Sequence, residues 1–242
     1  MCTVVIEVPA DSSLPTRVLA VRDEDPSRPW DPPGEWWPAD HPGTLGVRDR
    51  RANGAWLAFA PAAGRLSVVV NRAAELVEPA GGFSSRGSLV LASVAGGELA
   101  DPPTSAPFSL VEVAGSRARA RVSAWDGVEL RHEELSPGVH MLAHHDVDDL
   151  RSERIARWLP EFQALAGAPK SEWRALWLGL LARTAELGTT DDRAIVRDNR
   201  PLGYPTLSLL TCIADVAADG VDLEWAAFDE PGSWGEPEFS AV

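Results

Sequence analysis

The chain has 242 residues, of which 45% are apolar and 24% are charged, a composition that can supply a full hydrophobic core. Its formal net charge of -14 at pH 7 argues against binding to nucleic acid or to anionic membrane surfaces, because both require a basic face. The length fits one large domain, and we expect residues 1–242 to form a single domain.

Cysteine usage and the N-terminal residues predict the compartment. The two cysteines, Cys2 and Cys212, lie far apart, which is not a disulfide framework and favours a reducing compartment. The N-terminus lacks the features of a signal peptide, and no apolar run approaches the roughly 20 residues of a membrane span. Lys170 is the only lysine among many arginines, a skew typical of a high-GC bacterial genome. We therefore expect a soluble, cytoplasmic, bacterial protein.

The first third of the chain is predicted to form hairpins. Val4–Val8 and Val18–Val21 are apolar, β-branched runs joined by the turn-rich segment "PADSSLP". Residues 26–43, "PSRPWDPPGEWWPADHPG", contain too many prolines for regular structure and are expected to cover apolar surface. Ala55–Ala60 and Leu66–Val70, separated by "PAAGR", form a second hairpin pattern.

The middle of the chain continues with short elements. The segment 87–94 fits either a helix or a strand. The runs "FSLVEV", "RARVSAW" and "VELRHEEL" predict a meander, with Asp126-Gly127 as a two-residue turn. The run "GVHMLA" at 138–143 is a further strand candidate.

The last third of the chain combines helices with strands. After Asp149, apolar residues fall at helical spacing, with Pro160 expected to break or kink the helix. A second helix is expected after Ser171, its predicted N-cap. The apolar faces of the two helices consist of Ile155, Trp158, Leu159, Phe162 and Leu165, and of Trp173, Leu176, Trp177, Leu180 and Leu181. Leu207–Ala214 and Val221–Phe228 return to strand patterns, so the fold class is α+β with antiparallel sheets.

The first hairpin gives Cys2 a chemical context. With the loop centred near residues 12 and 13, the pairing places Cys2 opposite Asp23, with Arg22 and Glu24 as neighbours. If Met1 is removed, Cys2 gains a free α-amine with a pKa of about 7.7–8.0, which can serve as the base for its own thiol. The alternative is an ordinary buried cysteine at the start of a strand, and the hairpin by itself favours that alternative.

Several blocks in order along the chain resemble the NRDE protein family, whose eukaryotic members are called transport and Golgi organisation proteins. "VRDEDPSRP" (21–29) resembles the family signature "NRDEF.SRP", and "GVRDRRANGAWLAF" (46–59) is similar to "G.D...GGTWLG". "GRLSVVVNR" (64–72), "SSRGSLV" (84–90), "LSPGVHMLAHH" (135–145) and "YPTLSLL" (204–210) resemble four further family blocks. The family also begins Met-Cys.

This resemblance implies a fold and a set of site residues. The implied fold is the four-layer αββα sandwich of two antiparallel sheets found in N-terminal nucleophile hydrolases. In related cysteine amidases the catalytic pattern is carried by residues that correspond here to Cys2, Arg22, Asp23 and Asn71, with Asn71 as the donor to the oxyanion. Asn71 could equally be a turn residue that ends a strand. The residues expected to bind the ligand are Glu24, Arg28, Trp30, Trp56, Arg86 and His144.

The chain departs from the family pattern at three positions. Val21, His144 and Leu207 stand where the family has Asn, Asn and Arg. His144 and His145 are adjacent and would point to opposite faces of a strand, so no metal site is expected.

Two functions remain open at this stage. The first is a hydrolase that cleaves a non-peptide amide with Cys2 as nucleophile and needs no cofactor. The second is a non-catalytic protein that binds an acyl-lipid, an acyl thioester or haem in the same cleft, with His144 as a conceivable haem ligand. In either case the partner is a small molecule, and the tryptophan-rich loop with Trp30, Trp36 and Trp37 is the expected lid. The sequence leaves the oligomeric state open.

Overall fold

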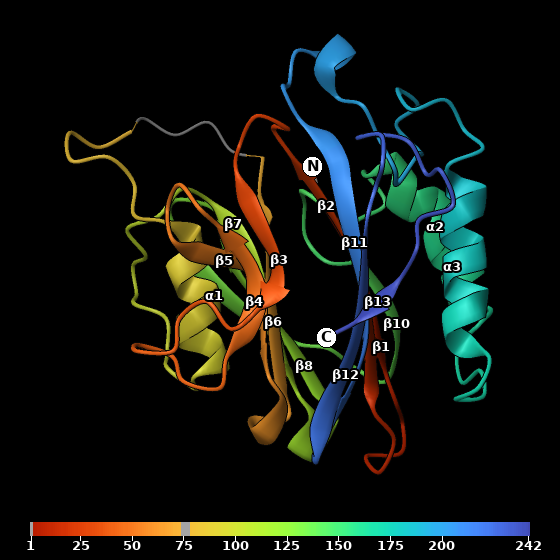
Figure 1. The fold of residues 1–242 in the computed structure, drawn as a ribbon, viewed down its shortest axis with the longest axis horizontal. Helices are drawn as coiled ribbons and strands as arrows, with labels where there is room; N and C mark the ends of the chain where they lie inside the picture. Colours follow the sequence, from red (N-terminus) through yellow and green to blue (C-terminus); the bar gives the residue numbers. More distant parts are fainter. Residues whose placement is uncertain (1, 74–77) are drawn as a thin grey trace.

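The computed structural model describes residues 2–73 and 78–242, and its two antiparallel sheets are stacked face to face (Figure 1). The first sheet has the strand order β10-β1-β2-β11-β12-β13 and the second the order β3-β4-β5-β6-β7-β8-β9. The strands of the first sheet are β1 (Thr3–Val8), β2 (Thr16–Glu24), β10 (Gly138–Leu142), β11 (Leu207–Ala217), β12 (Gly220–Ala227) and β13 (Ser240–Ala241). Those of the second are β3 (Trp30–Gly34), β4 (Leu45–Asp49), β5 (Gly54–Ala60), β6 (Arg65–Asn71), β7 (Phe108–Ala114), β8 (Arg119–Trp125) and β9 (Leu130–Glu134).

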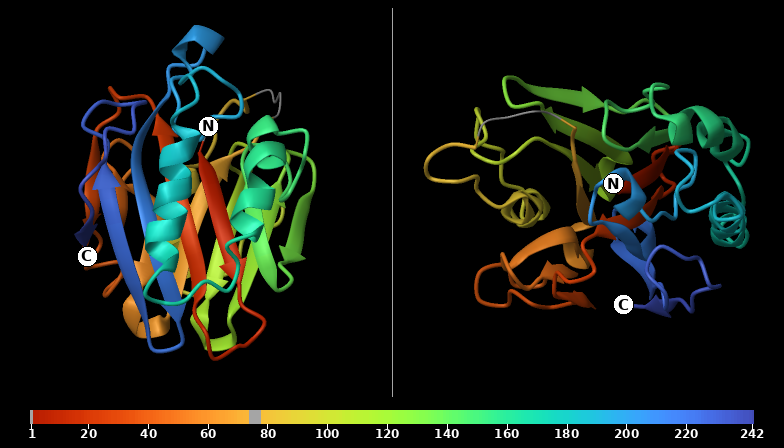
Figure 2. Two further views of the ribbon diagram at one scale, coloured as in Figure 1. Left: turned by 90° about the vertical axis from the view of Figure 1, so that its right-hand side faces the viewer. Right: turned by 90° about the horizontal axis from the view of Figure 1, so that it is seen from above.

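Helices cover the outer face of each sheet. Helix α1 (Arg86–Val94) packs on β5, β6 and β7, whereas α2 (Glu153–Gln163) and α3 (Trp173–Thr184) lie on the first sheet (Figures 1 and 2). Short 3-10 helices occur at Pro61–Ala63, Gly115–Arg117 and Arg200–Leu202. The expected αββα layering is therefore confirmed. No helix in the described part of the chain is long and apolar enough to cross a membrane.

Strand β1 shows how the sequence builds these layers. All six of its residues are buried, because the first sheet is covered on both faces. Val4 and Ile6 belong to the apolar cluster that includes the space between the sheets, while Val5 packs in the cluster under α2 and α3. Since side chains alternate along a strand, Cys2 falls on the same side as Val4 and Ile6.

The first hairpin forms as predicted, but its register is one residue away from the expected one. Thr3 pairs with Val21, which places Arg22 and not Asp23 opposite Cys2. The reason is the loop, which is centred on residue 12 and not between residues 12 and 13. The correction moves Arg22 to the face between the sheets and Asp23 to the face under the helices.

The proline-rich segment was predicted to lack regular structure, and this is wrong for part of it. Trp30–Gly34 forms β3, an edge strand that pairs only with β4 in the described residues. Its pairing is irregular between Asp31 and Gly34, around the two prolines. An edge strand tolerates proline because one side of the strand needs no backbone donors.

The predicted helices exist with different boundaries. Helix α2 continues through Pro160 to Gln163, so the proline does not end it. Helix α3 begins at Trp173, and its N-cap is Glu172 instead of the expected Ser171. Leu176 was expected on the buried face of α3 but is 40% exposed. The ambiguous segment 87–94 is helical, and the loop at Asp126-Gly127 has four residues, because Trp125 pairs with Leu130.

Candidate functional site

Cys2 lies at the start of β1 and contacts the strand beside it. Its Sγ accepts a hydrogen bond from the Asp23 backbone N–H at 3.3 Å, and its thiol faces the Asp23 carbonyl oxygen at 3.5 Å. The residue is 6% exposed. Burial, together with the negative charge of Asp23, raises the pKa of the Cys2 thiol. The sulfur is therefore a neutral thiol at pH 7 and needs a base before it can attack a substrate.

Arg22 lies opposite Cys2, between the two sheets. Its side chain is 3% exposed, and its Nη2 is 3.5 Å from Glu24 Oε2. Its Nη1 is buried and has no hydrogen-bond acceptor within residues 2–73 and 78–242. Burial lowers the pKa of this guanidinium, because a charged group loses its water. Arg22 thus brings an incompletely compensated positive charge to the thiol.

Asp23 points to the other face of the sheet, where two neutral donors hold its carboxylate. Ser208 Oγ donates to Asp23 Oδ1 at 2.6 Å, and Asn199 Nδ2 donates to Oδ2 at 3.3 Å. Ser208 is also the backbone partner of Asp23, beside an irregularity in β11 that ends at Leu210. Bulges of this kind re-aim side chains next to functional sites.

Sequence reasoning did not identify Ser208 and Asn199 as part of the site. Ser208 lies inside the "YPTLSLL" block, so the resemblance to the family could have indicated it as a site residue. Asn199 lies outside the blocks that resemble the family, and it is 176 residues away from Asp23 in the sequence. No local pattern could reveal that contact.

Arg154 was also missed, although it reaches the site from α2. It is 2% exposed, and its Nη1 donates to Thr3 Oγ1 at 2.7 Å. Burial lowers the pKa of Arg154 to about 10, and the carboxylate of Asp23 opposes that shift. A buried arginine thus lies on the helix side of the site, while Arg22 lies on the side between the sheets.

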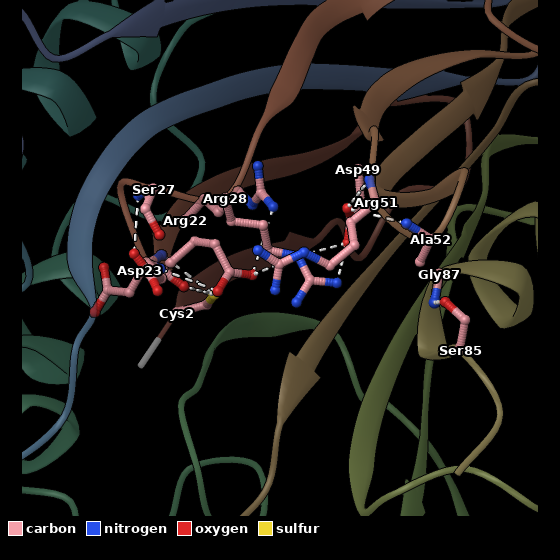
Figure 3. Close-up of polar contacts among 12 residues, drawn as sticks. Cys2, Arg22, Asp23, Ser27, Arg28, Asp49, Arg51, Ala52, Ser85 and Gly87 are labelled. Carbon is pink, nitrogen blue, oxygen red and sulfur yellow. Dashed lines mark hydrogen bonds and ion pairs between the residues drawn. The ribbon is translucent and has the colours of Figure 1, made fainter. Parts of the chain in front are cut away.

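A cavity of about 420 Å³ lies between β2, β5, β6 and the start of α1. It is lined by Arg22, Glu24, Arg28, Asp49, Ala52, Ala55, Trp56, Val69, Asn71, Phe83, Ser84, Ser85, Arg86, Gly87 and Ala106. Figure 3 shows charged side chains in a row from Cys2 and Asp23 on one side to Asp49 and the start of α1 on the other. Gly54 and Gly87 allow this arrangement, since a Cβ built on Gly54 would lie 2.7 Å from the Gly87 Cα.

The cavity brings together many of the predicted site residues. Five of them, besides Arg22, contribute to its wall: Asn71, Glu24, Arg28, Trp56 and Arg86. Arg28 Nε donates to Asp49 Oδ2 at 2.7 Å, which ties the segment that follows β2 to the end of β4. Cys2 and Asp23 lie next to this wall but do not form part of it.

The tryptophan-rich segment does not cover the cavity, contrary to the expectation of a lid. Trp30 packs edge-to-face on Trp225 of β12 with 6.3 Å between the ring centroids. Trp37 is buried, and its indole donates to the Asn53 carbonyl at 2.8 Å. Trp36 stacks under Arg48. The three rings pack in or against the apolar core, and none of them lines the cavity.

His144 lies just beyond β10 and outside the cavity wall. Its Nδ1 is buried without a partner in the described part of the chain. Burial, with additional repulsion from His145 and Arg154, lowers the pKa of His144 to about 4. The imidazole is therefore neutral at pH 7.

The low pKa of His144 predicts acid sensitivity. An unfolded histidine has a pKa of about 6.5, so between pH 6.5 and 4 the unfolded chain binds more protons than the folded one. The free energy of unfolding should therefore decrease as the pH is lowered from 6.5 to 4, and less steeply in His144→Asn, as measured by urea denaturation at each pH. His41→Asn is the control, because that side chain makes no hydrogen bond in the described residues. Equal pH slopes for the wild type and His144→Asn would contradict the assignment.

Comparison with known proteins gives one family match and distant structural similarity. The sequence model of the family described as Transport and Golgi organisation 2 matches residues 1–159. No curated protein matches the chain in sequence. A Caenorhabditis elegans N-acylethanolamine-hydrolyzing acid amidase ortholog superposes with a TM-score of 0.48 and 10% identity, covering 88% of this chain and 92% of that one. The C2A mutant of conjugated bile acid hydrolase from Clostridium perfringens superposes with a TM-score of 0.48 and 9% identity, covering 100% and 96%.

Proposed function

Because the chain belongs to the Transport and Golgi organisation 2 family and has Cys2 beside a cavity, we propose that it is a cysteine hydrolase of non-peptide amides. In this proposal Cys2 is the nucleophile and its own α-amine is the base. Met1 lies outside the described residues, so its removal is part of the proposal.

The observation that carries the proposal is the buried carboxylate of Asp23 beside Cys2. The backbone of Asp23 contacts the Cys2 sulfur, while Ser208 and Asn199 donate hydrogen bonds to its carboxylate. A buried carboxylate that hydrogen bonds hold in place is suited to stabilise a nearby ammonium group. That is the requirement of an N-terminal nucleophile, whose α-amine becomes an ammonium during the reaction.

The first half of the reaction forms an acyl-enzyme. The α-amine of Cys2 takes the thiol proton while the sulfur attacks the amide carbonyl carbon, which gives a tetrahedral oxyanion. Asn71, at the end of β6 and in the cavity wall, is the proposed donor to that oxyanion. The ammonium then protonates the leaving nitrogen as the C–N bond breaks. An amine leaves, and a thioester remains on Cys2.

The second half releases the acid. The α-amine takes a proton from water while the water oxygen attacks the thioester carbon. The C–S bond breaks, the carboxylic acid leaves, and the sulfur recovers its proton from the ammonium. No step needs a metal or another cofactor, since the amine serves as base and acid in turn.

Ligand handling without catalysis is the second candidate function, and one observation favours it. The raised pKa of the buried Cys2 thiol is what a structural cysteine would show. In that case the same cavity would bind an acyl-lipid or acyl thioester and release it unchanged.

The placement of His144 favours an acyl ligand over haem in this second candidate. A haem ligand has to face the pocket that holds the macrocycle, whereas His144 lies outside the wall of the cavity. Its Nδ1 is buried and faces no solvent. The described residues that line this cavity include no histidine, and no step of the mechanism involves haem.

Intact mass spectrometry of the purified protein tests the hydrolase proposal first. We expect the mass of the chain without Met1, because a small second residue permits removal of the initiator methionine. A Cys2→Leu variant is the control, since a bulky second residue should retain Met1. If the wild-type protein keeps Met1, the α-amine cannot act as the base and the proposed mechanism is wrong.

A further inference from the structure

Two side chains that line the cavity each carry a buried nitrogen atom with no hydrogen-bond acceptor among residues 2–73 and 78–242. The two atoms are Nη1 of Arg22, on β2, and Nε1 of Trp56, on β5. Nine buried side-chain atoms lack a partner in the described residues, and only these two belong to the wall of this cavity. The larger groove of about 760 Å³, between residues 7–17 and 166–170, has none of the nine in its wall. Two of the nine unsatisfied atoms thus belong to side chains that line a cavity open to a ligand.

Both orphaned groups are donors, so the ligand that satisfies them has to supply acceptors. A buried donor without an acceptor is costly, and a ligand oxygen that reaches it recovers that cost on binding. Guanidinium is matched in shape and charge by a carboxylate. A neutral carbonyl oxygen would satisfy one donor but add no negative charge beside Arg22, whose guanidinium has only the Glu24 carboxylate at 3.5 Å as an ion-pair partner in the described residues.

The charges around the cavity favour an anionic group. Arg28 is paired with Asp49, so neither of them is available to a ligand. Arg86 lines the cavity and donates only to the Pro107 carbonyl at 3.1 Å, with no carboxylate within ion-pair distance in the described residues. Burial lowers the pKa of Arg86, in keeping with its missing counter-charge. Glu24 also lines the cavity, with its Oε2 3.5 Å from Arg22 Nη2. The wall therefore carries three arginines against the two carboxylates of Glu24 and Asp49, a local cationic excess in a chain whose net charge is -14.

The remaining wall residues indicate that the rest of the ligand is apolar. Ala55, Val69, Phe83 and Ala106 provide apolar surface next to the charged groups. The nine-residue helix α1 begins at the same wall and adds the positive end of its dipole. An elongated molecule with an apolar part and one carboxylate matches both halves.

We propose that this cavity binds a carboxylate through Arg22 Nη1 and Trp56 Nε1, so that the substrates are small apolar amides that carry a carboxylate group. The inference rests on the proposed function for the bond that is cleaved. Binding of the carboxylate does not depend on hydrolysis and can be measured without it.

Isothermal titration calorimetry with hexanoate and hexanamide tests this inference. The two probes have the same chain, but only hexanoate carries a charge, and neither is expected to turn over in a Cys2→Ala protein. We expect saturable binding of hexanoate and at least about tenfold weaker binding of hexanamide. Equal affinities, or no binding of hexanoate, would overturn the inference.

Two variants locate the site. Trp56→Phe removes one orphaned donor and keeps the ring, so its stability in urea should be unchanged or higher while hexanoate affinity falls about tenfold. Arg22→Gln should lose hexanoate binding and is the second route if Trp56→Phe does not fold. Trp177→Phe is the matched control, because Trp177 Nε1 is also orphaned but belongs to the core under α3. Equal hexanoate affinity in the wild type and both site variants would overturn the assignment.

The outcomes separate the inference from the proposed function. If hexanoate binds as expected but no amide is cleaved, the carboxylate site stands and the hydrolase proposal falls. If amides are cleaved with no preference for a carboxylate, the hydrolase proposal stands and the inference falls.

Discussion

Replacing Cys2 by alanine should abolish amide hydrolysis. The expected loss in kcat/KM is at least roughly 10³-fold, because the variant keeps the cavity but has no atom to form the acyl-enzyme. The assay is release of the coloured amine from a hexanoyl nitroanilide whose ring carries a carboxylate. Mass spectrometry of the wild-type protein, quenched during turnover, should show hexanoylated Cys2.

Cys212 provides the matched control for this experiment. It is a free, buried cysteine on β11, and burial raises the pKa of its thiol well above its ordinary value. Cys212→Ala should therefore keep the wild-type rate. Hydrolysis that persists in Cys2→Ala, or that is lost equally in Cys212→Ala, would show that Cys2 is not the nucleophile.

Replacing Asp23 by asparagine should both destabilise the protein and abolish most of its amide hydrolysis. The change removes the carboxylate that most strongly favours the charged form of the buried Arg154, and weakening a buried charge pair costs about 3 kcal/mol. The new amide NH₂ would also face either Ser208 Oγ or Asn199 Nδ2, both of which donate to the carboxylate in the native structure. Urea denaturation measures the stability loss. In the absence of urea, the nitroanilide assay should show a fall in kcat of at least roughly 10²-fold.

Asp25→Asn is the control for this second prediction. Asp25 follows β2 directly, is partly exposed, and its carboxylate accepts a hydrogen bond from the nearby Ser27 N–H. This variant should match the wild type in both measurements. If Asp23→Asn is destabilised but fully active, Asp23 has only a structural role, and the proposed stabilisation of the α-ammonium is wrong.

Local patterns were sufficient for much of the fold. The apolar, β-branched runs at Val4–Val8 and Leu66–Val70 form β1 and β6, since alternation and turn residues are encoded within a few positions. The strand Leu45–Asp49 was missed because Gly46 and the charged residues at its end hide the alternation. The edge strand at Trp30–Gly34 was missed because its prolines are tolerated only through its place in the sheet.

The register of the first hairpin shows where such reasoning loses precision. A loop centre displaced by half a residue changed the partner of Cys2 from Asp23 to Arg22. As a result, the side chains of Cys2 and Asp23 point to opposite faces of the sheet. Cys2, Arg22 and Asp23 are neighbours in the structure, as predicted. Cys2 and Arg22 lie between the sheets, whereas the Asp23 side chain lies under the helices.

The sequence by itself determined the family, the position of Cys2 at the second residue, and the hairpin that brings it beside Arg22 and Asp23, because these depend on order and short-range pairing. The tertiary structure alone decided the contacts of Asp23 with Ser208 and Asn199, the approach of Arg154 from α2, and the cavity in which Arg22 and Trp56 lack acceptors. Those features join residues up to 185 positions apart. They arise from the stacking of two sheets and the burial of charge between their layers, which no local pattern encodes.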